Sequence, residues 1–118
     1  MAKTIRIENL FENLPSSLPD EQFNELASGK EFRLERIIST AHATPAGRWY
    51  DQEQDEWVIL LRGAAGLRFE DQADLVSLNP GDCLLIPAGC RHRVEWTHPE
   101  LPTVWLALHY QPRGGVDV

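Results

Sequence analysis

GDCLLIPAGCRH, residues 81–92, contains the strongest structural signal in the chain. Gly81 permits a tight turn with positive φ, and the apolar run that follows ends at Pro87, which has no backbone N–H to continue a ladder. Gly89 allows the chain to turn again before His92 begins a new segment. The stretch therefore predicts a short β-strand enclosed between two turns, with His92 at the start of the next strand.

Segments with strand character lie on both sides of this stretch. Segment 31–40 places Phe32, Leu34 and then Ile38 in alternation, with Arg33 and Glu35 on the other side. The expected strands fall within residues 31–40, 56–63, 66–71, 74–82, 83–89, 92–97 and 103–110. Short strands that recur at roughly 8–12 residues, with turn signals between them, predict an antiparallel all-β sandwich or barrel.

The first third of the chain has a different residue pattern from the strand segments. Pro15 and Pro19 interrupt it, and Asp20–Ala27 then brings Phe23, Leu26 and Ala27 to one face at helical spacing. We expect one or two helical turns there. The predicted organisation has three parts: an N-terminal extension with a short helix at residues 1–30, a β-barrel at residues 31–112, and a loose C-terminal tail at residues 113–118.

Composition and charge exclude several classes of protein. The 118 residues are 42% hydrophobic and 25% charged, which is ordinary for one globular domain and not for a disordered chain. A net charge of -7 and no clustered basic residues argue against nucleic acid or an anionic membrane as partner. No apolar run is long enough for a membrane helix, and Met1–Asn13 has no secretory pattern. Cys83 and Cys90 fit free thiols, so we expect a cytoplasmic protein.

Two motifs in order make the chain resemble the cupin superfamily of small β-barrels. The second cupin motif, G-x5-P-x-G-x2-H-x3-N, is matched through His92, and Trp96 stands where the family has Asn. From the first motif, G-x5-H-x-H-x3-4-E-x6-G, Glu56 and Gly63 keep their six-residue separation. The resemblance covers roughly residues 32–110 and implies a double-stranded β-helix, or jelly-roll barrel, built from two Greek keys.

The first motif departs from the family in its two histidines. The shorter spacing before Glu56 places Tyr50 and Gln52 at the histidine positions, which is the register we favour, and the longer spacing places Trp49 and Asp51 there. The resemblance implies a divalent metal, Fe, Mn, Ni or Zn, and Gln52, Glu56 and His92 as its remaining ligands. Such a set is poor in imidazole and weak. A bound metal and a metal-free polar pocket therefore both remain open.

Strand alternation and the resemblance together predict the site. His92, Val94 and Trp96 share one face of their strand, and Glu56, Val58 and Leu60 share one face of theirs. We expect Glu56, His92 and Tyr50 as catalytic residues, and Gln52, Trp96 and His109 as ligand-binding residues. A barrel of this size holds one small ligand among such inward polar residues.

The function is less narrowly determined. We expect a small-molecule enzyme of isomerase or lyase type, acting on a carboxylated or sugar-like metabolite, because losing the histidine pair disfavours oxygenase chemistry. A binding module without turnover and a plain structural dimer are the alternatives. No P-loop or dinucleotide fingerprint occurs, so no nucleotide cofactor is expected. Trp57, Ile59 and Leu61, on the second face of their strand, are apolar as well, which predicts a homodimer.

Overall fold

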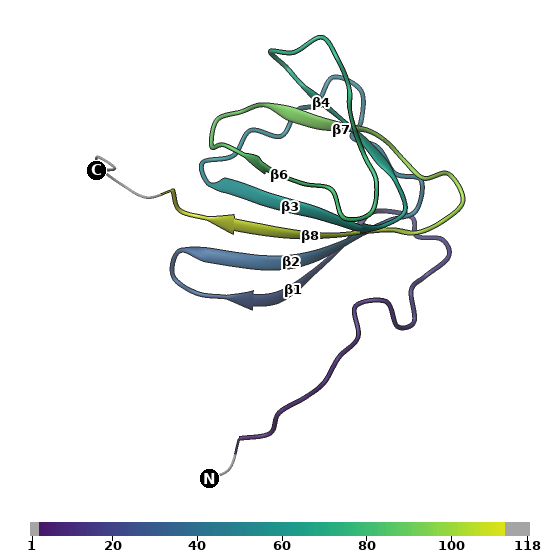
Figure 1. Ribbon diagram of the computed structural model, residues 1–118, viewed down its shortest axis with the longest axis vertical. Helices are drawn as coiled ribbons and strands as arrows, with labels where there is room; N and C mark the ends of the chain where they lie inside the picture. The colour runs from purple at the N-terminus through teal and green to yellow at the C-terminus, as the bar shows by residue number, and fades with distance from the viewer. Residues whose placement is uncertain (1–2, 113–118) are drawn as a thin grey trace.

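The computed structural model describes residues 3–112, which form two antiparallel β-sheets (Figure 1). One sheet has the strand order β1-β2-β8-β3-β6 and the other has the order β5-β4-β7. The strands are β1 (Gln22–Ser28), β2 (Phe32–Ser39), β3 (Asp55–Arg62), β4 (Ala65–Phe69), β5 (Val76–Leu78), β6 (Cys83–Ile86), β7 (His92–Thr97) and β8 (Thr103–Tyr110). The all-β prediction is confirmed.

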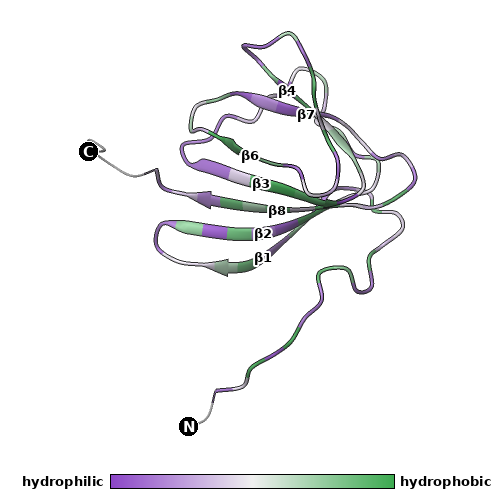
Figure 2. Cartoon of the chain, in the orientation of Figure 1, coloured by the Kyte–Doolittle hydropathy of each residue, from purple (hydrophilic) through white to green (hydrophobic). Residues whose placement is uncertain are grey.

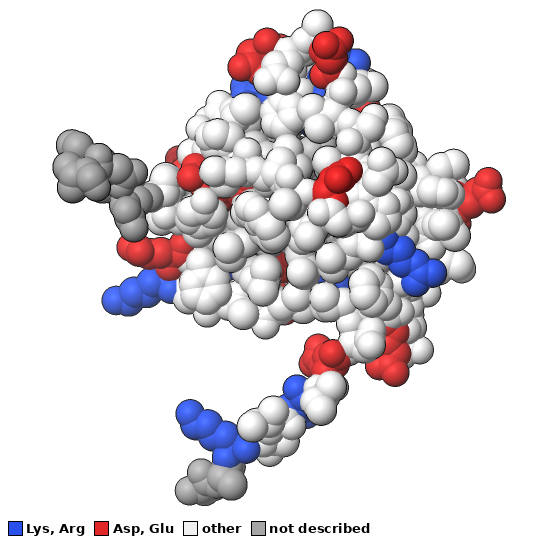
Figure 3. Space-filling view, viewed as in Figure 1, with Lys and Arg blue, Asp and Glu red and all other residues white. Residues whose placement is uncertain are grey.

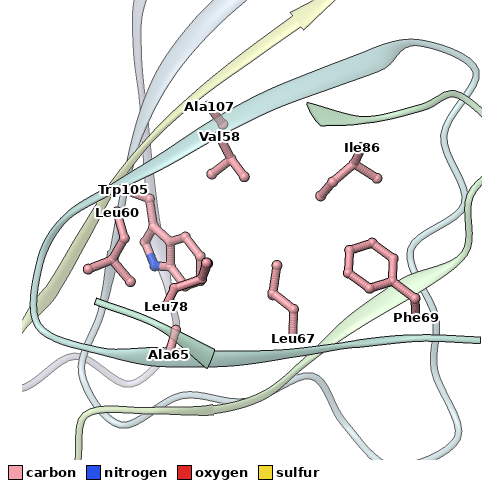
Figure 4. Packing of buried hydrophobic residues seen from close by; sticks show 9 residues of the cluster. All are labelled: Val58, Leu60, Ala65, Leu67, Phe69, Leu78, Ile86, Trp105 and Ala107. Atoms are coloured by element: carbon pink, nitrogen blue, oxygen red, sulfur yellow. The ribbon is translucent and has the colours of Figure 1, made fainter. Parts of the chain in front are cut away.

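The hydrophobic core lies between the two sheets (Figure 4). It is built from alternate residues of the facing strands, because each strand turns one side toward the other sheet. Its members are Val58, Leu60, Ala65, Leu67, Phe69, Leu78, Ile86, Trp105 and Ala107. The chain passes from one sheet to the other at Gly63, whose φ is +89° and whose neighbour is the Thr103 backbone. A side chain at Gly63 would be strained and would also collide with that backbone.

The predicted N-terminal helix is wrong. Gln22–Ser28 instead forms β1, which pairs antiparallel with β2 along its length and has a bulge between Glu25 and Ala27. A helix of eight residues is marginal by itself, whereas β2 offers a full row of unpaired N–H and C=O groups. Pairing with that edge therefore decides the conformation of the segment. The predicted tail at residues 113–118 lies outside the described residues.

One end of the barrel carries the polar ends of several strands. Figure 2 shows polar residues at the start of β3 and of β7 and at the end of β8, all at the same end of the molecule. Their partners in the sheet are fixed by register, since Glu56 of β3 lies opposite His109 of β8 and Ile86 of β6. Within residues 3–112 there is no helix long and apolar enough to cross a membrane.

Candidate functional site

A cavity of about 320 Å³ opens at this polar end of the barrel. Its floor is apolar and is shared with the core, and its wall carries the charged and aromatic side chains. The lining residues are Glu21, Phe23, Arg33, Glu35, Ile37, Tyr50, Gln52, Glu56, Val58, Leu67, Ile86, His92, Val94 and Trp105. A volume of this size is enough for one small metabolite.

Tyr50 and His92 are held side by side by a single β-bridge outside the main strands. The Tyr50 N–H donates to the His92 carbonyl at 2.7 Å, and the His92 N–H donates to the Tyr50 carbonyl at 3.1 Å. Residues paired in this way project to the same side of the backbone. Their rings consequently stack with centroids 5.6 Å apart, and the ring of Phe69 lies 6.0 Å from the imidazole on another side.

The orientation of the His92 ring leaves one nitrogen for the pocket. Its Nδ1 lies 3.0 Å from the carbonyl oxygen of Cys90. A carbonyl oxygen only accepts, so Nδ1 carries the hydrogen and, in the neutral ring, Nε2 presents a lone pair. That Nε2 lies 3.7 Å from Oε1 of Glu56. In its neutral form the imidazole therefore presents a proton-accepting nitrogen beside the Glu56 carboxyl group.

Glu56 is buried and stands between two imidazoles. Its Oε1 accepts a hydrogen bond of 2.8 Å from the Gln52 side-chain amide, while His92 lies on the same side at 3.7 Å. Its Oε2 lies 3.9 Å from Nε2 of His109. A buried carboxylate needs such partners, because burial of an unpaired charge is costly. The four side chains therefore form one connected polar group at the pocket wall.

Behind this group, His109 is bonded to a second carboxylate. Its Nε2 donates to Oε1 of Glu35 at 3.0 Å, and Nδ1 is buried without a partner among the described residues. The hydrogen bond from His109 lowers the pKa of Glu35 below the ordinary 4.5, outweighing the opposing effect of burial, and the charge of Arg33 adds to the lowering. Glu35 is thus held as a carboxylate that faces the pocket.

The two registers of the first motif differ in which residues they bring to the pocket. Tyr50 and Gln52 line the cavity, and Asp51 between them is exposed. Trp49 instead lies outside the lining and packs near the guanidinium groups of Arg91 and Arg93. Burial and the nearby charge of Glu21 raise the pKa of Tyr50 above 10.0. Tyr50 therefore keeps its phenolic hydrogen and can donate it to a ligand oxygen.

Trp96 does not join the other expected site residues. The pairing of β7 with β4 shifts between Trp96, opposite Gly66, and Val94, opposite Leu67, so Glu95 is an extra residue in β7. A bulge of this kind reverses the alternation of faces. Trp96 consequently lies on the outside, where its indole packs over Gly66, and is absent from the cavity lining. His109 also lies outside that lining and reaches the site through Glu35 and Glu56.

Sequence reasoning missed several pocket residues, among them Glu21, Phe23, Arg33 and Glu35. The first two adjoin or belong to the strand that was expected to be a helix. Arg33 and Glu35 belong to the polar side of β2, and a polar side normally faces solvent. The available signal was the cupin motif itself, which implies a polar interior and so allows charged residues of other strands to face inward.

The donor groups of the pocket do not fit a tightly held divalent metal. Within residues 3–112, no group of three or more His, Cys, Asp or Glu side chains is arranged to hold a metal ion. Gln52 presents its NH2 group, a hydrogen donor and not a ligand, to Glu56. Tyr50 is a protonated phenol, and His109 is turned to Glu35.

Fold and pocket together define a small β-barrel that encloses a cavity lined by both polar and apolar side chains. The chain belongs to the cupin family, because the model of the cupin domain matches residues 40–109. The resemblance inferred from the sequence motifs is thereby confirmed. No curated protein matches the chain.

Several solved structures are similar to the chain. A candidate mannose-6-phosphate isomerase from Ralstonia eutropha JMP134 is 47% identical, with 91% of this chain and 99% of that chain covered and a TM-score of 0.88. A cupin superfamily protein from Desulfitobacterium hafniense DCB-2 is 17% identical over 91% and 99%, with a TM-score of 0.69. An RmlC-like cupin with a double-stranded β-helix fold, from Methanocaldococcus jannaschii, is 13% identical over 90% and 93%, with a TM-score of 0.66. The last two support the fold alone.

Proposed function

We propose that this chain is an isomerase-type cupin enzyme that moves a hydrogen between adjacent carbon atoms of a small, uncharged, sugar-like substrate. The observation that carries the proposal is the position of Glu56. Its buried carboxylate lines the cavity and lies 3.7 Å from Nε2 of His92 and 3.9 Å from Nε2 of His109. The similarity to the candidate mannose-6-phosphate isomerase supports the same class of reaction.

The charges around the cavity support an uncharged substrate over an anionic one. Three carboxylates, those of Glu21, Glu35 and Glu56, line the cavity, against a single guanidinium, that of Arg33. That guanidinium is already engaged, since its Nε lies 3.5 Å from Oε2 of Glu35. A phosphate or carboxylate on the substrate would meet an excess of like charge. Of the carboxylated and sugar-like metabolites expected from the sequence, the sugar-like class therefore fits better.

The reaction balances with the side chains present. In an open-chain aldose, the Glu56 carboxylate takes the proton from C2, and the electron pair of that bond forms the C1–C2 double bond. Nε2 of His92 takes the proton of O2 and passes it to O1, on which charge develops. Glu56 then returns its proton to C1 as the carbonyl forms at C2. Tyr50, which keeps its hydrogen, stabilises the negative charge on oxygen by donating a hydrogen bond.

Hydrogen exchange in D2O tests the proposal directly. The wild-type protein is incubated with D-mannose or with D-mannose 6-phosphate, and proton NMR follows the loss of the C2 hydrogen and the appearance of the ketose. We expect exchange on D-mannose to exceed that on its phosphate. Glu56→Gln should lower the exchange rate about 100-fold or more, because the general base is lost. Exchange should persist after treatment with a chelator.

The matched control is Glu70→Gln, which removes a carboxylate that pairs with Arg91 at the surface and lies outside the cavity. Its exchange rate should equal that of the wild type. Equal loss in both variants, or an unchanged rate in Glu56→Gln, would contradict the assignment of the base. Saturable sugar binding without any exchange would favour the alternative function, a metabolite-binding barrel without turnover.

A further inference from the structure

A chain of hydrogen bonds inside the barrel ends on Glu21, a cavity residue that the proposed reaction does not use. The indole Nε1 of Trp105 donates to the Ser39 hydroxyl at 3.2 Å, and that hydroxyl is bonded to Oε2 of Glu21. An indole N–H only donates, so the Ser39 oxygen accepts it and the single hydroxyl hydrogen goes to Glu21. The direction of the chain is therefore fixed, and Glu21 stands at its end as an acceptor.

The first two members of this chain are buried, and they hold the third in place. Ser39 is 0% exposed and Trp105 is 4% exposed, whereas Glu21 is half-buried and lines the cavity. Breaking the chain would leave a buried hydroxyl and a buried indole N–H without their partners, which is costly. A carboxylate has about four acceptor positions, and Ser39 uses one of them. Glu21 is thus a positioned carboxylate with capacity left for a ligand.

Glu21 and the proposed base lie at different ends of the cavity. Ser39, which holds Glu21, is four residues along β2 from Glu35, a separation of about 13 Å in a strand. Glu35 lies with Glu56 at the reacting end, since one imidazole contacts both carboxylates. Tyr50 lies within reach of both ends, because the charges of Glu21 and Glu56 both raise the pKa of its phenol. The cavity therefore has a reacting end and a second end marked by Glu21.

The middle of the cavity, between these two ends, is apolar. Phe23 of β1 lies opposite Ile37 of β2, and both residues line the cavity. Ile37 is the inward residue between Glu35 and Ser39, so the pair falls between the two ends. A ligand that suits this order has a carbon backbone that packs against Phe23 and polar groups at both of its own ends. An open-chain sugar has this character.

Glu21 also carries the uncompensated charge of the cavity. The guanidinium of Arg33 lies 3.5 Å from Glu35, and two imidazoles flank Glu56. By contrast, no Lys, Arg or His side chain within residues 3–112 forms an ion pair with Glu21. Figure 3 shows Lys and Arg side chains that are few and scattered over the face in view, without a basic patch there. A phosphate beside Glu21 would therefore meet a like charge, whereas a hydroxyl would find an acceptor.

We propose that Glu21 is a specificity-determining residue, which accepts a hydrogen bond from the terminal hydroxyl of the substrate, remote from the reacting carbons, and rejects a substrate phosphorylated there. This inference rests on the proposed sugar-like substrate and adds the residue that selects it. Ser39 is a positioning residue, because its hydroxyl fixes the Glu21 carboxylate without lining the cavity.

Proton NMR titration of the full chain with D-mannose, D-mannose 6-phosphate and 6-deoxy-D-mannose tests the inference. In Glu21→Gln, the dissociation constant for D-mannose should rise about tenfold, because a hydrogen bond to a charged acceptor is lost, and that for the phosphate should fall about tenfold. A general loss of structure would not move the two constants in opposite directions. The deoxy sugar should bind about tenfold more weakly than D-mannose to the wild type, and equally well to Glu21→Gln.

The matched control is Glu25→Gln, which removes a β1 carboxylate that is also bonded to a serine hydroxyl, that of Ser28, but lies outside the cavity lining. Its three dissociation constants should equal those of the wild type. A second variant, Ser39→Ala, keeps the charge of Glu21 and releases its side chain. It should weaken D-mannose binding about threefold to tenfold and still discriminate against the phosphate. Circular dichroism checks that each variant keeps the fold.

The outcomes separate this inference from the proposed reaction. Dissociation constants of Glu21→Gln that all match those of Glu25→Gln overturn the role of Glu21, even where the wild type exchanges the C2 hydrogen. Selective binding by a wild type that shows no exchange overturns the reaction and supports Glu21 as the selecting residue. A wild type that binds neither D-mannose nor its phosphate overturns both. An unchanged affinity of folded Ser39→Ala for D-mannose overturns the positioning role of Ser39.

Discussion

At the scale of single residues, the pair of Glu35 and His109 links the pocket to the buried part of the sheet. His109 bonds to Glu35 at 3.0 Å and lies 3.9 Å from Glu56, so it influences the base of the proposed reaction without lining the cavity. We assign it as a positioning residue. Glu35, whose pKa is lowered by its hydrogen bond with this imidazole, is also a source of pH-dependent stability.

The sign of that pH dependence follows from Glu35, whose pKa in the folded state is lower than the ordinary 4.5. A carboxyl with a lowered pKa adds stability above the unfolded value, and this contribution is lost as the pH falls through the folded value. Urea unfolding of the wild type and of Glu35→Gln, from about pH 6 to about pH 3, should therefore show a difference in unfolding free energy that shrinks on acidification. A difference independent of pH would contradict this.

At the scale of the elements, glycines at the turns allow the strands to change sheets. Gly63, between β3 and β4, and Gly81, between β5 and β6, have φ values of +89° and +95°. A Cβ at Gly63 would lie 2.8 Å from the Thr103 Cα, whereas one at Gly81 would have nothing within 4 Å. The two positions thus share backbone strain and differ in the space available.

Substituting alanine at each of these two glycines separates the cost of a positive φ from the cost of a steric collision with the Thr103 backbone. Gly81→Ala should cost about 1–2 kcal/mol, the penalty of a left-handed conformation. Gly63→Ala should cost about 1–3 kcal/mol more, since the Thr103 backbone must move as well. Urea unfolding measures both values at the same pH and protein concentration. An equal loss of unfolding free energy in the two variants would contradict the predicted collision, because it would show that the Thr103 backbone moves aside at no cost.

At the scale of the whole molecule, folding and association should be coupled if the apolar face that Trp57 and Leu85 present to solvent is buried in the homodimer that the sequence predicts. A partner that binds only the folded chain raises stability by mass action, so the melting temperature rises with protein concentration. We expect this rise for the wild type and a much smaller one for Leu85→Glu, which places a charge opposite Trp57 on that face, measured by calorimetry over a range of concentrations. A melting temperature of the wild type that is constant over that range would contradict the coupling.

The sequence by itself determined most of the barrel. Seven of the eight strands were predicted near their true positions. The signals were local: apolar segments bounded by turn residues such as Gly81, Pro87 and Gly89. Motif spacing also indicated that Glu56 and His92 belong to one pocket. The turn residues act locally and do not depend on how the strands are arranged. The motif spacing is typical of a family whose fold brings both residues to one pocket.

Tertiary structure decided the features that depend on contacts distant in sequence. The edge of β2 converted the expected helix into β1, and a bulge opposite Gly66 turned Trp96 away from the pocket. The closure of the barrel placed the polar side of β2 inward, which brought Glu35 to His109 across 74 residues of sequence. The alternation of side chains along a strand predicts which residues share a face. Which of the two faces points into the barrel is determined only by packing against other strands.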